Sequence, residues 1–279
     1  MEKKISAIVV VSLLVFVQNI FAGSYVSVLK GTIKGVNVTF KDNLSVAEIY
    51  IKTGYGECNG NYFEIPNDIT YGLTSISGEN FYYIYIDDSD AVYPILNSDV
   101  GIVHSTDEPK WDDAKQGWYR FYEDDGITEV DSTDKDDRCI GVVWIDDSNN
   151  LRWFNNVNEQ ITWAERSYLA SNMSGNSYVW QQPNAAEGPT VLPKNAIKAF
   201  CYIHAACGAL SRATVALTSK EAADQNNYFY ASNGIAARGY PKTLTMGWVY
   251  LGESRKLRIQ ADNSNTEVHA TLQGFEISR

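Results

Sequence analysis

Apolar and polar residues alternate in short runs along most of the chain, and clusters of Asn, Asp, Gly and Ser separate the runs. A period of two is the pattern of a β-strand with one buried and one wet face. Helical spacing is confined to 161–171 and 221–225. The pattern therefore predicts an all-β, antiparallel fold, with strands over 26–40, 46–54, 80–87, 139–146, 151–154, 196–208, 213–219, 227–232, 244–251, 256–262 and 267–277.

One stretch, 171–189, interrupts this pattern because it is rich in Asn, Ser, Gly and Pro. That composition is typical of a linker. It divides the chain into an N-terminal β domain over 23–170 and a C-terminal domain over 190–279. The later strands number about six or seven, which suits a sandwich or a jelly roll. We expect two β-sandwich or jelly-roll-like domains.

Residues 1–22 have the features of a secretory signal peptide. Lys3 and Lys4 precede an apolar core of about ten residues, and Ala22 fits the position before a cleavage site. The apolar core is shorter than the roughly 20 residues that a membrane-spanning helix needs. We expect a secreted or cell-surface protein whose mature chain begins near Gly23 and has no membrane span.

The chain is acidic, with a formal net charge of −11. Such a surface repels phosphate backbones, so nucleic acid is not an expected partner. Asp131, Asp134, Asp136 and Asp137 offer hard oxygen ligands, and a Ca²⁺ site in this loop is one interpretation. A solvated acidic loop is the other, because the spacing is not that of an EF-hand. No other cofactor is expected.

The run Cys139 to Phe154 predicts a hairpin whose loop is 146–150. Asn149 or Asn150 can take the left-handed conformation that such a loop requires. The hairpin loop and the acidic loop before the strand should lie about 20 Å apart, at opposite ends of it. A metal cage or carboxylate pair shared by these two loops is therefore disfavoured.

An exported chain with four cysteines can hold two disulfides. Cys201 and Cys207 share one predicted strand and would lie about 20 Å apart along it, so they cannot bridge each other unless the strand bends. We expect a structural disulfide between Cys58 and Cys139.

Sequence patterns of catalysis are absent: the chain has no GxSxG, HExxH or phosphate-binding loop. His104, His204 and His269 are read as ordinary loop and sheet residues. Glycoside hydrolysis needs only two carboxylates about 5 to 10 Å apart, so a polysaccharide hydrolase stays open as an alternative.

The sequence indicates a binding site more strongly than a catalytic one. The candidate is segment 108–126, which combines aromatic rings with charged residues. Aromatic faces stack on sugar rings while nearby acids and amides bond the hydroxyls. Trp111, Trp118, Tyr119 and Tyr122 are the candidate glycan-binding residues. In the alternative interpretation these rings cover the sheet beneath a long loop.

The chain resembles modules of bacteriophage tail fibres and related virion appendages. The positions that carry the resemblance are an aromatic strand, a proline, an R-x-I-G run and a hairpin: Tyr82, Tyr83, Ile84, Tyr85, Pro109, Arg138, Ile140, Gly141, Asp146, Leu151 and Phe154. Segment 51–65 is similar to the preceding strand–turn–strand element, and 256–277 to the closing strands with their Gly274-Phe275 pair. Asn150 departs from the usual turn glycine, and a signal peptide is unexpected in a phage structural protein.

The resemblance implies a β-rich, oligomeric fibre or adhesive module, here on an exported protein. We therefore expect a non-catalytic surface protein that binds copies of itself and cell-surface glycan. One alternative is a structural subunit of a filament or coat, joined by strand addition through the N-terminal run. That run can equally be the first strand of its own domain.

Overall fold

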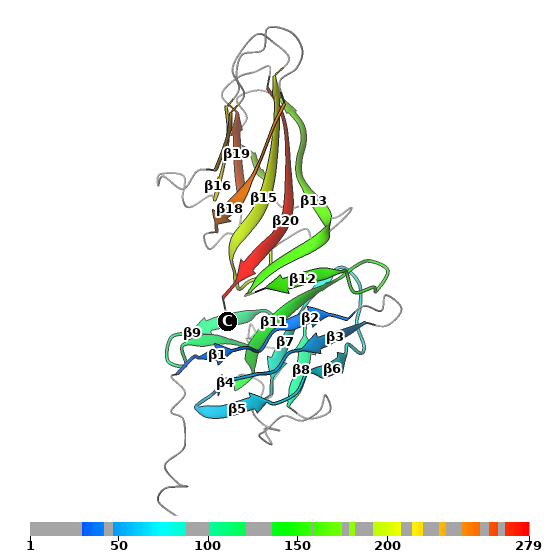
Figure 1. The fold of residues 1–279 in the computed structure, drawn as a ribbon, viewed down its shortest axis with the longest axis vertical. Coiled ribbons are helices and arrows are strands. Elements are labelled where there is room, and N and C mark those ends of the chain that lie inside the picture. The colour runs from blue at the N-terminus through cyan, green and yellow to red at the C-terminus, as the bar shows by residue number, and fades with distance from the viewer. Residues whose placement is uncertain are drawn as a thin grey trace, which may run out of the picture.

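The computed structural model describes residues 30–41, 47–87, 101–120, 136–157, 159–174, 179–181, 192–207, 214–219, 229–232, 242–251, 257–261 and 266–278. The named elements within them are β-strands, and their pairings are antiparallel. The all-β, antiparallel prediction is confirmed. The strands form a lower and an upper group in Figure 1. The expected signal peptide, 1–22, lies outside the described residues.

The lower group is built around a five-stranded sheet of order β8-β7-β11-β10-β9. Its strands are β7 (Asn80–Ile86), β8 (Ile102–Ser105), β9 (Pro109–Asp112), β10 (Gly117–Arg120) and β11 (Arg138–Ile145). Every residue of β11 is buried, and so are all residues of β7 except Asn80. Strands that are apolar on both faces must be covered on both faces. These two neighbouring strands, both predicted from the sequence, are therefore the centre of the core.

Two smaller sheets curl over one face of this sheet, and together they resemble half of a barrel (Figure 1). One has the order β1-β4-β5, from β1 (Ile33–Lys34), β4 (Gly54–Cys58) and β5 (Asn61–Ile65). The other has the order β2-β3-β6, from β2 (Val38–Phe40), β3 (Glu48–Ile51) and β6 (Ile69–Gly72).

Glycines make the bend between the two curled sheets. Gly35 separates β1 from β2 and has φ 79°, a conformation that favours glycine. A Cβ on Gly54 would lie 2.2 Å from the backbone nitrogen of Val36, so only glycine allows this close approach. The single strand expected over 26–40 is therefore wrong within the described residues, because the chain turns at Gly35. Residues 26–29 of that run lie outside them.

The predicted hairpin after β11 is confirmed at its loop. Ile145 and Leu151 form a bridge, and Asn149 has φ 63°. The Asp146 carboxylate accepts hydrogen bonds from the backbone nitrogens of Ser148 (2.9 Å) and Asn150 (2.8 Å), which fixes the turn. The predicted return strand, 151–154, pairs with β11 only at Leu151, because the chain then enters β12 in the upper group.

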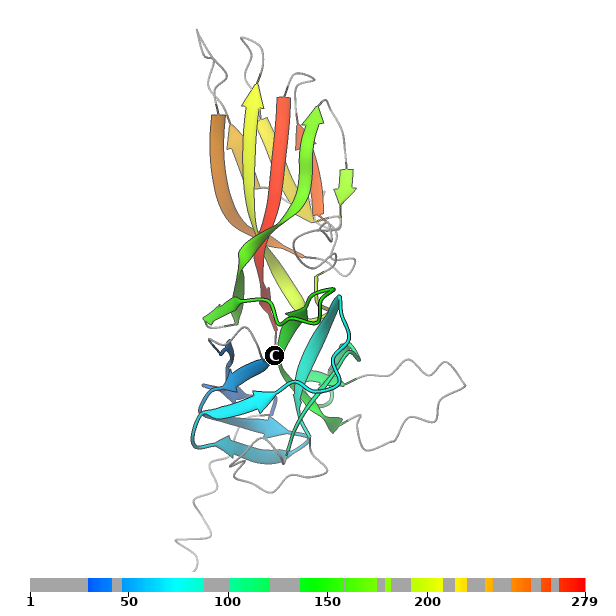
Figure 2. The ribbon, with the colours of Figure 1, turned by 90° about the vertical axis from the view of Figure 1, so that its right-hand side faces the viewer.

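The upper group contains a sheet of order β12-β13-β20-β15-β18. Its strands are β12 (Phe154–Val157), β13 (Gln160–Ser174), β15 (Ala196–Cys207), β18 (Lys242–Tyr250) and β20 (Thr266–Ile277). A second sheet, of order β14-β19-β16-β17, contains β14 (Val179–Gln181), β16 (Thr214–Ser219), β17 (Phe229–Ser232) and β19 (Leu257–Ala261). In Figure 2 the first sheet faces the viewer and the strands of the second lie behind it.

Two strands of the upper group lie where the sequence predicted the end of the first domain and the linker. β13 runs through the predicted boundary at 170 and pairs with β20 over most of its length. β14 lies inside the predicted 171–189 linker and pairs with β19. Pairing with long neighbouring strands overrides a composition that disfavours β structure. The helix considered over 161–171 is wrong for the same reason, and the one over 221–225 lies outside the described residues.

Side chains from both groups meet at a packed junction. The rings of Phe81 and Phe275 contact edge to face, with centroids 6.1 Å apart. The backbone nitrogen of Lys194 donates to the Tyr83 hydroxyl at 3.1 Å, and Asn156 Nδ2 donates to the Val38 carbonyl at 3.1 Å. Buried residues of both groups belong to one core cluster. The halves are therefore held together by apolar and polar contacts.

A buried tyrosine links the curled sheet to the edge of the five-stranded one. The Tyr71 hydroxyl, from β6, bonds Nδ1 of His104, on β8, at 2.7 Å. Nε2 of His104 bonds the Thr74 carbonyl at 2.8 Å. Because a carbonyl can only accept, Nε2 carries the proton and Nδ1 accepts from Tyr71.

This link predicts a loss of stability at alkaline pH. Burial raises the pKa of Tyr71 from 10.0 to about 12. The unfolded chain loses this proton first as pH rises above 10, so unfolding becomes easier until the folded protein also ionises. We expect Tyr71→Phe to reduce the fall in melting temperature between about pH 9 and pH 12. Equal falls in the variant and the wild type, measured by circular dichroism, would refute this assignment.

Candidate functional site

Two tryptophans from the predicted binding segment lie beside each other on the β9–β10 hairpin. Trp111 and Trp118 are cross-strand partners, and their rings meet edge to face with centroids 6.0 Å apart. Trp111 is 39% exposed and Trp118 is half-buried. We call these two residues the tryptophan pair. The first part of segment 108–126 is therefore a hairpin and not part of a long loop.

The turn of this hairpin is fixed by its own acidic residues. Asp112 Oδ1 accepts hydrogen bonds from the backbone nitrogens of Ala114 (2.8 Å) and Lys115 (2.9 Å). Asp113 Oδ1 accepts from the Trp111 indole nitrogen at 2.8 Å and holds that ring in place. Gln116 closes the turn with φ 56°. The exposed indole therefore stands on a well-ordered turn, close to a carboxylate.

Tyr119, another candidate, does not belong to this exposed surface. It is 3% exposed, and its hydroxyl accepts a hydrogen bond from the Asn59 backbone nitrogen at 3.1 Å. Lys115 Nζ and the Arg138 guanidinium lie over its ring, 4.5 and 5.1 Å from the centroid. Burial raises the pKa of Tyr119. The prediction that Tyr119 stacks on a glycan is wrong, because its side chain points into the core. Tyr122 lies outside the described residues.

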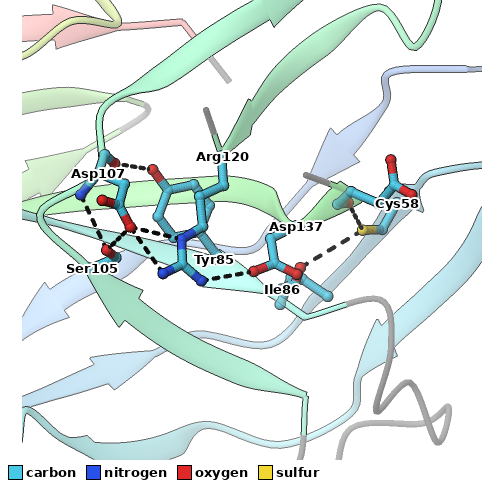
Figure 3. Close-up of polar contacts among 8 residues, drawn as sticks. Cys58, Tyr85, Ile86, Ser105, Asp107, Arg120 and Asp137 are labelled. Carbon is cyan, nitrogen blue, oxygen red and sulfur yellow. Dashed lines mark hydrogen bonds and ion pairs between the residues drawn. The ribbon is translucent and has the colours of Figure 1, made fainter. Parts of the chain in front are cut away.

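Arg120, next along β10, anchors the base of the hairpin (Figure 3). Its Nε and Nη2 atoms donate to Asp107 Oδ2 at 3.0 and 2.9 Å, and Nη1 lies 3.3 Å from Asp137 Oδ2. The Tyr85 hydroxyl donates to the Asp107 carbonyl at 2.5 Å, and Ser105 Oγ bonds the Asp107 carboxylate. Burial raises the pKa of Tyr85. This cluster ties the turn between β8 and β9 to β7, β10 and the start of β11.

The four aspartates considered for Ca²⁺ are described only in part. Asp136 forms an ion pair with Lys115, and Asp137 forms one with Arg120. These two carboxylates are thus directed to different cations and not to a common centre. Asp131 and Asp134 lie outside the described residues. Within the part of the chain that is described, no group of three or more His, Cys, Asp or Glu side chains is arranged to hold a metal.

The expected disulfide between Cys58 and Cys139 is wrong. Both residues are buried, and each carries a separate thiol. Cys58 Sγ lies 3.7 Å from the Ile86 carbonyl, at one end of β7 (Figure 3). Cys139 Sγ lies 3.6 Å from the Gly141 carbonyl and 3.9 Å from Asn195 Nδ2 in the upper half. The two sulfur atoms have different neighbours because they come from different sheets of the core.

A second aromatic surface, on β15 and β18, was missed from the sequence. Phe200, Tyr202 and Trp248 are half-buried there, while Met246 and Tyr250 are exposed. The signal was present: the runs over 196–203 and 246–250 are apolar in both alternating positions. In a strand with only one buried face, the outward positions are usually polar, so aromatic residues there indicate a second apolar surface.

No family model matches the chain, and no curated protein matches it. No helix among the residues given above is long and apolar enough to cross a membrane. The functional argument therefore rests on the two aromatic surfaces and on the chemistry around them.

Proposed function

We propose that this protein is exported and acts outside the cell as a non-catalytic, carbohydrate-binding surface protein that associates with copies of itself. Its two halves are β-sandwich or jelly-roll-like domains. The observation that carries the proposal is the tryptophan pair, an exposed indole packed against a half-buried one on a braced hairpin. The resemblance to tail-fibre modules supports the same kind of role, attachment to a surface.

The chemistry of the hairpin favours a sugar as ligand. Indole faces stack on the C–H faces of pyranose rings, and neighbouring polar groups bond the hydroxyls. Asp113 is exposed beside the tryptophan pair, where it bonds the Trp111 indole nitrogen, and it offers a carboxylate acceptor. The acidic chain, at −11, repels polyanions. Neutral or cationic polysaccharides therefore suit this surface better than sulfated ones.

Binding without hydrolysis is favoured by the state of the nearby carboxylates. A glycoside hydrolase needs two carboxyl groups about 5 to 10 Å apart that can exchange protons with the substrate. At the base of the hairpin, Arg120 bonds both Asp107 and Asp137. Asp112 is similarly occupied by the backbone of the turn. These carboxylates serve the fold of the hairpin.

Removing the tryptophan pair tests the proposal. We expect Trp111→Ala combined with Trp118→Ala to weaken binding to immobilised polysaccharides at least about tenfold, because buried Trp contacts dominate binding energy. The measurement is retention on a panel of cellulose, chitin, mannan and xylan, with an array of shorter glycans.

Trp153→Ala is the matched control. Trp153 is a similarly exposed indole, at 44%, but it packs beside Phe40 of β2 and is not part of the β9–β10 hairpin. It should bind as the wild type does. Release of soluble sugar from any of the polysaccharides, or equal binding by the double variant, would contradict the proposal. The melting temperature of each variant shows whether the fold is intact.

A further inference from the structure

One face of the upper five-stranded sheet is unusually apolar where β15 and β18 pair. Ala199, Cys201 and Ile203 of β15 point inward and are buried. The alternate residues point outward. The β15–β18 face consists of these outward residues: Phe200, Tyr202, Met246, Trp248 and Tyr250.

The members of the β15–β18 face form one continuous surface. Phe200 pairs with Trp248 across the strands, and Tyr202 pairs with Met246. The Phe200 and Trp248 rings lie 4.9 Å apart and are tilted by 33°, and the Phe200 and Tyr202 rings lie 5.5 Å apart. Met246 is 59% exposed and Tyr250 is 56% exposed. This face therefore exposes two large apolar side chains to solvent.

The charges beside the β15–β18 face neutralise each other. Lys198 Nζ lies 2.6 Å from Glu276 Oε1 and 5.0 Å from the centre of the Tyr250 ring. Lys198 is the cross-strand partner of Tyr250, so this ion pair lies at one end of the face and leaves it without net charge. An uncharged aromatic centre with methionine and a polar rim is the composition of a protein–protein interface.

We propose that the β15–β18 face packs against the same face of a second copy of this chain. Two chains of net charge −11 repel each other, so a surface without net charge is a favourable place for them to approach closely. This face meets that condition. Because the same residues face each other, the contact is isologous and closes as a symmetric pair.

The size of the face agrees with this partner. Large apolar side chains present about 150–250 Å² each, and only Met246 and Tyr250 are more than half exposed, so the face can bury on the order of 300 Å² per copy. A standard interface buries about 800 Å² per partner. The face is thus the apolar centre of such an interface, with the ion pair of Lys198 and Glu276 at its rim.

A second copy suits the face better than a sugar does. Phe200 and Met246 have no group that can bond a hydroxyl, and they contribute to the middle of the face. The tryptophan pair lies in the other half of the molecule, on another sheet. This inference rests on the self-association that the proposed function includes, and it identifies the surface through which the copies associate. Glycan binding is tested separately.

The test is the mass of the mature protein by light scattering over a range of concentrations. We expect a mass of at least twice that of the monomer for the wild type. Met246→Glu combined with Tyr250→Glu places like charges against each other, and we expect it to raise the dissociation constant at least about tenfold. Both side chains are exposed, so the melting temperature should be unchanged.

Tyr55→Glu combined with Tyr62→Glu is the matched control. These two tyrosines are 37% and 41% exposed on β4 and β5, where their rings contact each other away from the face. This control should keep the mass of the wild type, as should the Trp111→Ala, Trp118→Ala variant.

A monomeric wild type at high concentration would overturn the inference, and so would an oligomer that the Met246 and Tyr250 substitutions leave intact. If these substitutions abolish polysaccharide binding but not association, the face takes a glycan and the inference is wrong. Loss of binding only in the tryptophan variant, with mass changed only in the Met246 variant, supports both proposals independently.

Discussion

Arg138→Ala is expected to lower the free energy of unfolding by about 3 kcal/mol or more. Arg138 is fully buried, at the start of β11. Its Nη2 and Nη1 atoms donate to the carbonyls of Gly31 (3.0 Å) and Gln116 (3.4 Å), and its guanidinium lies against the Tyr119 ring. Truncation leaves these partly buried acceptors without their donor and opens a cavity. Urea unfolding, with an unchanged m-value, measures the loss.

Arg152→Ala is the control for this prediction. Arg152 also forms an ion pair, with Asp146 at 3.0 Å, but its side chain is 35% exposed. Ion pairs at the surface contribute about 0–1 kcal/mol. Arg138→Met restores volume but not the hydrogen bonds, so it should recover only part of the stability. Equal effects of the two alanine substitutions would show that the buried guanidinium does not hold the curled sheets to β11.

Phe275→Ala is expected to cost about 3–5 kcal/mol, because a large buried ring is replaced by a cavity. Phe275 is 1% exposed and lies near the end of β20, where it contacts Phe81 of the lower half. The junction is continuous with the core of both halves, so we expect one cooperative unfolding transition at a lower temperature. Differential scanning calorimetry measures both the number of transitions and the midpoint.

Phe275→Leu keeps most of the apolar volume and should lose much less stability. The informative contrary result is a second transition. If Phe275→Ala leaves the lower half melting at the wild-type temperature while the upper half melts early, the two halves are independent domains. Their junction would then not fix the tryptophan pair relative to the β15–β18 face.

Sequence alone predicted the fold class and the central strands well. β7 and β11 are apolar apart from Asn80 and Arg138 at their first positions, and the Asp and Asn residues after β11 gave the hairpin loop correctly. The long closing strands β15 and β20 also coincide with predicted runs. These elements are predictable because buried strands appear as short apolar runs bounded by turn residues.

The errors have physical causes as well. β9 and β10 were missed because edge strands near the surface carry charged residues that hide the alternation. β13 was assigned partly to a helix and partly to a linker, and only its pairing with β20 makes it a strand. The burial of Arg138 and Tyr119 depends on contacts with the distant Gly31 and Asn59, which spacing along the chain cannot show.

The candidate site was half predictable. Trp111 and Trp118 were identified from their composition, and their exposure on one hairpin is consistent with that interpretation. The β15–β18 face was not identified, because an aromatic residue in a strand is usually assigned to the core. When the residues on both faces of a strand are apolar, the neighbouring sheet determines which face is covered and which is exposed.

The central claim is that carbohydrate binds at the tryptophan pair. The most direct measurement is an NMR titration of the seven indole N–H signals with the oligosaccharide that binds best on the glycan array. The signals of Trp111 and Trp118 should shift as the oligosaccharide is added, until the site is saturated, while those of Trp153 and Trp248 stay in place. Shifts at Trp153 or Trp248 without shifts at the tryptophan pair would contradict the claim.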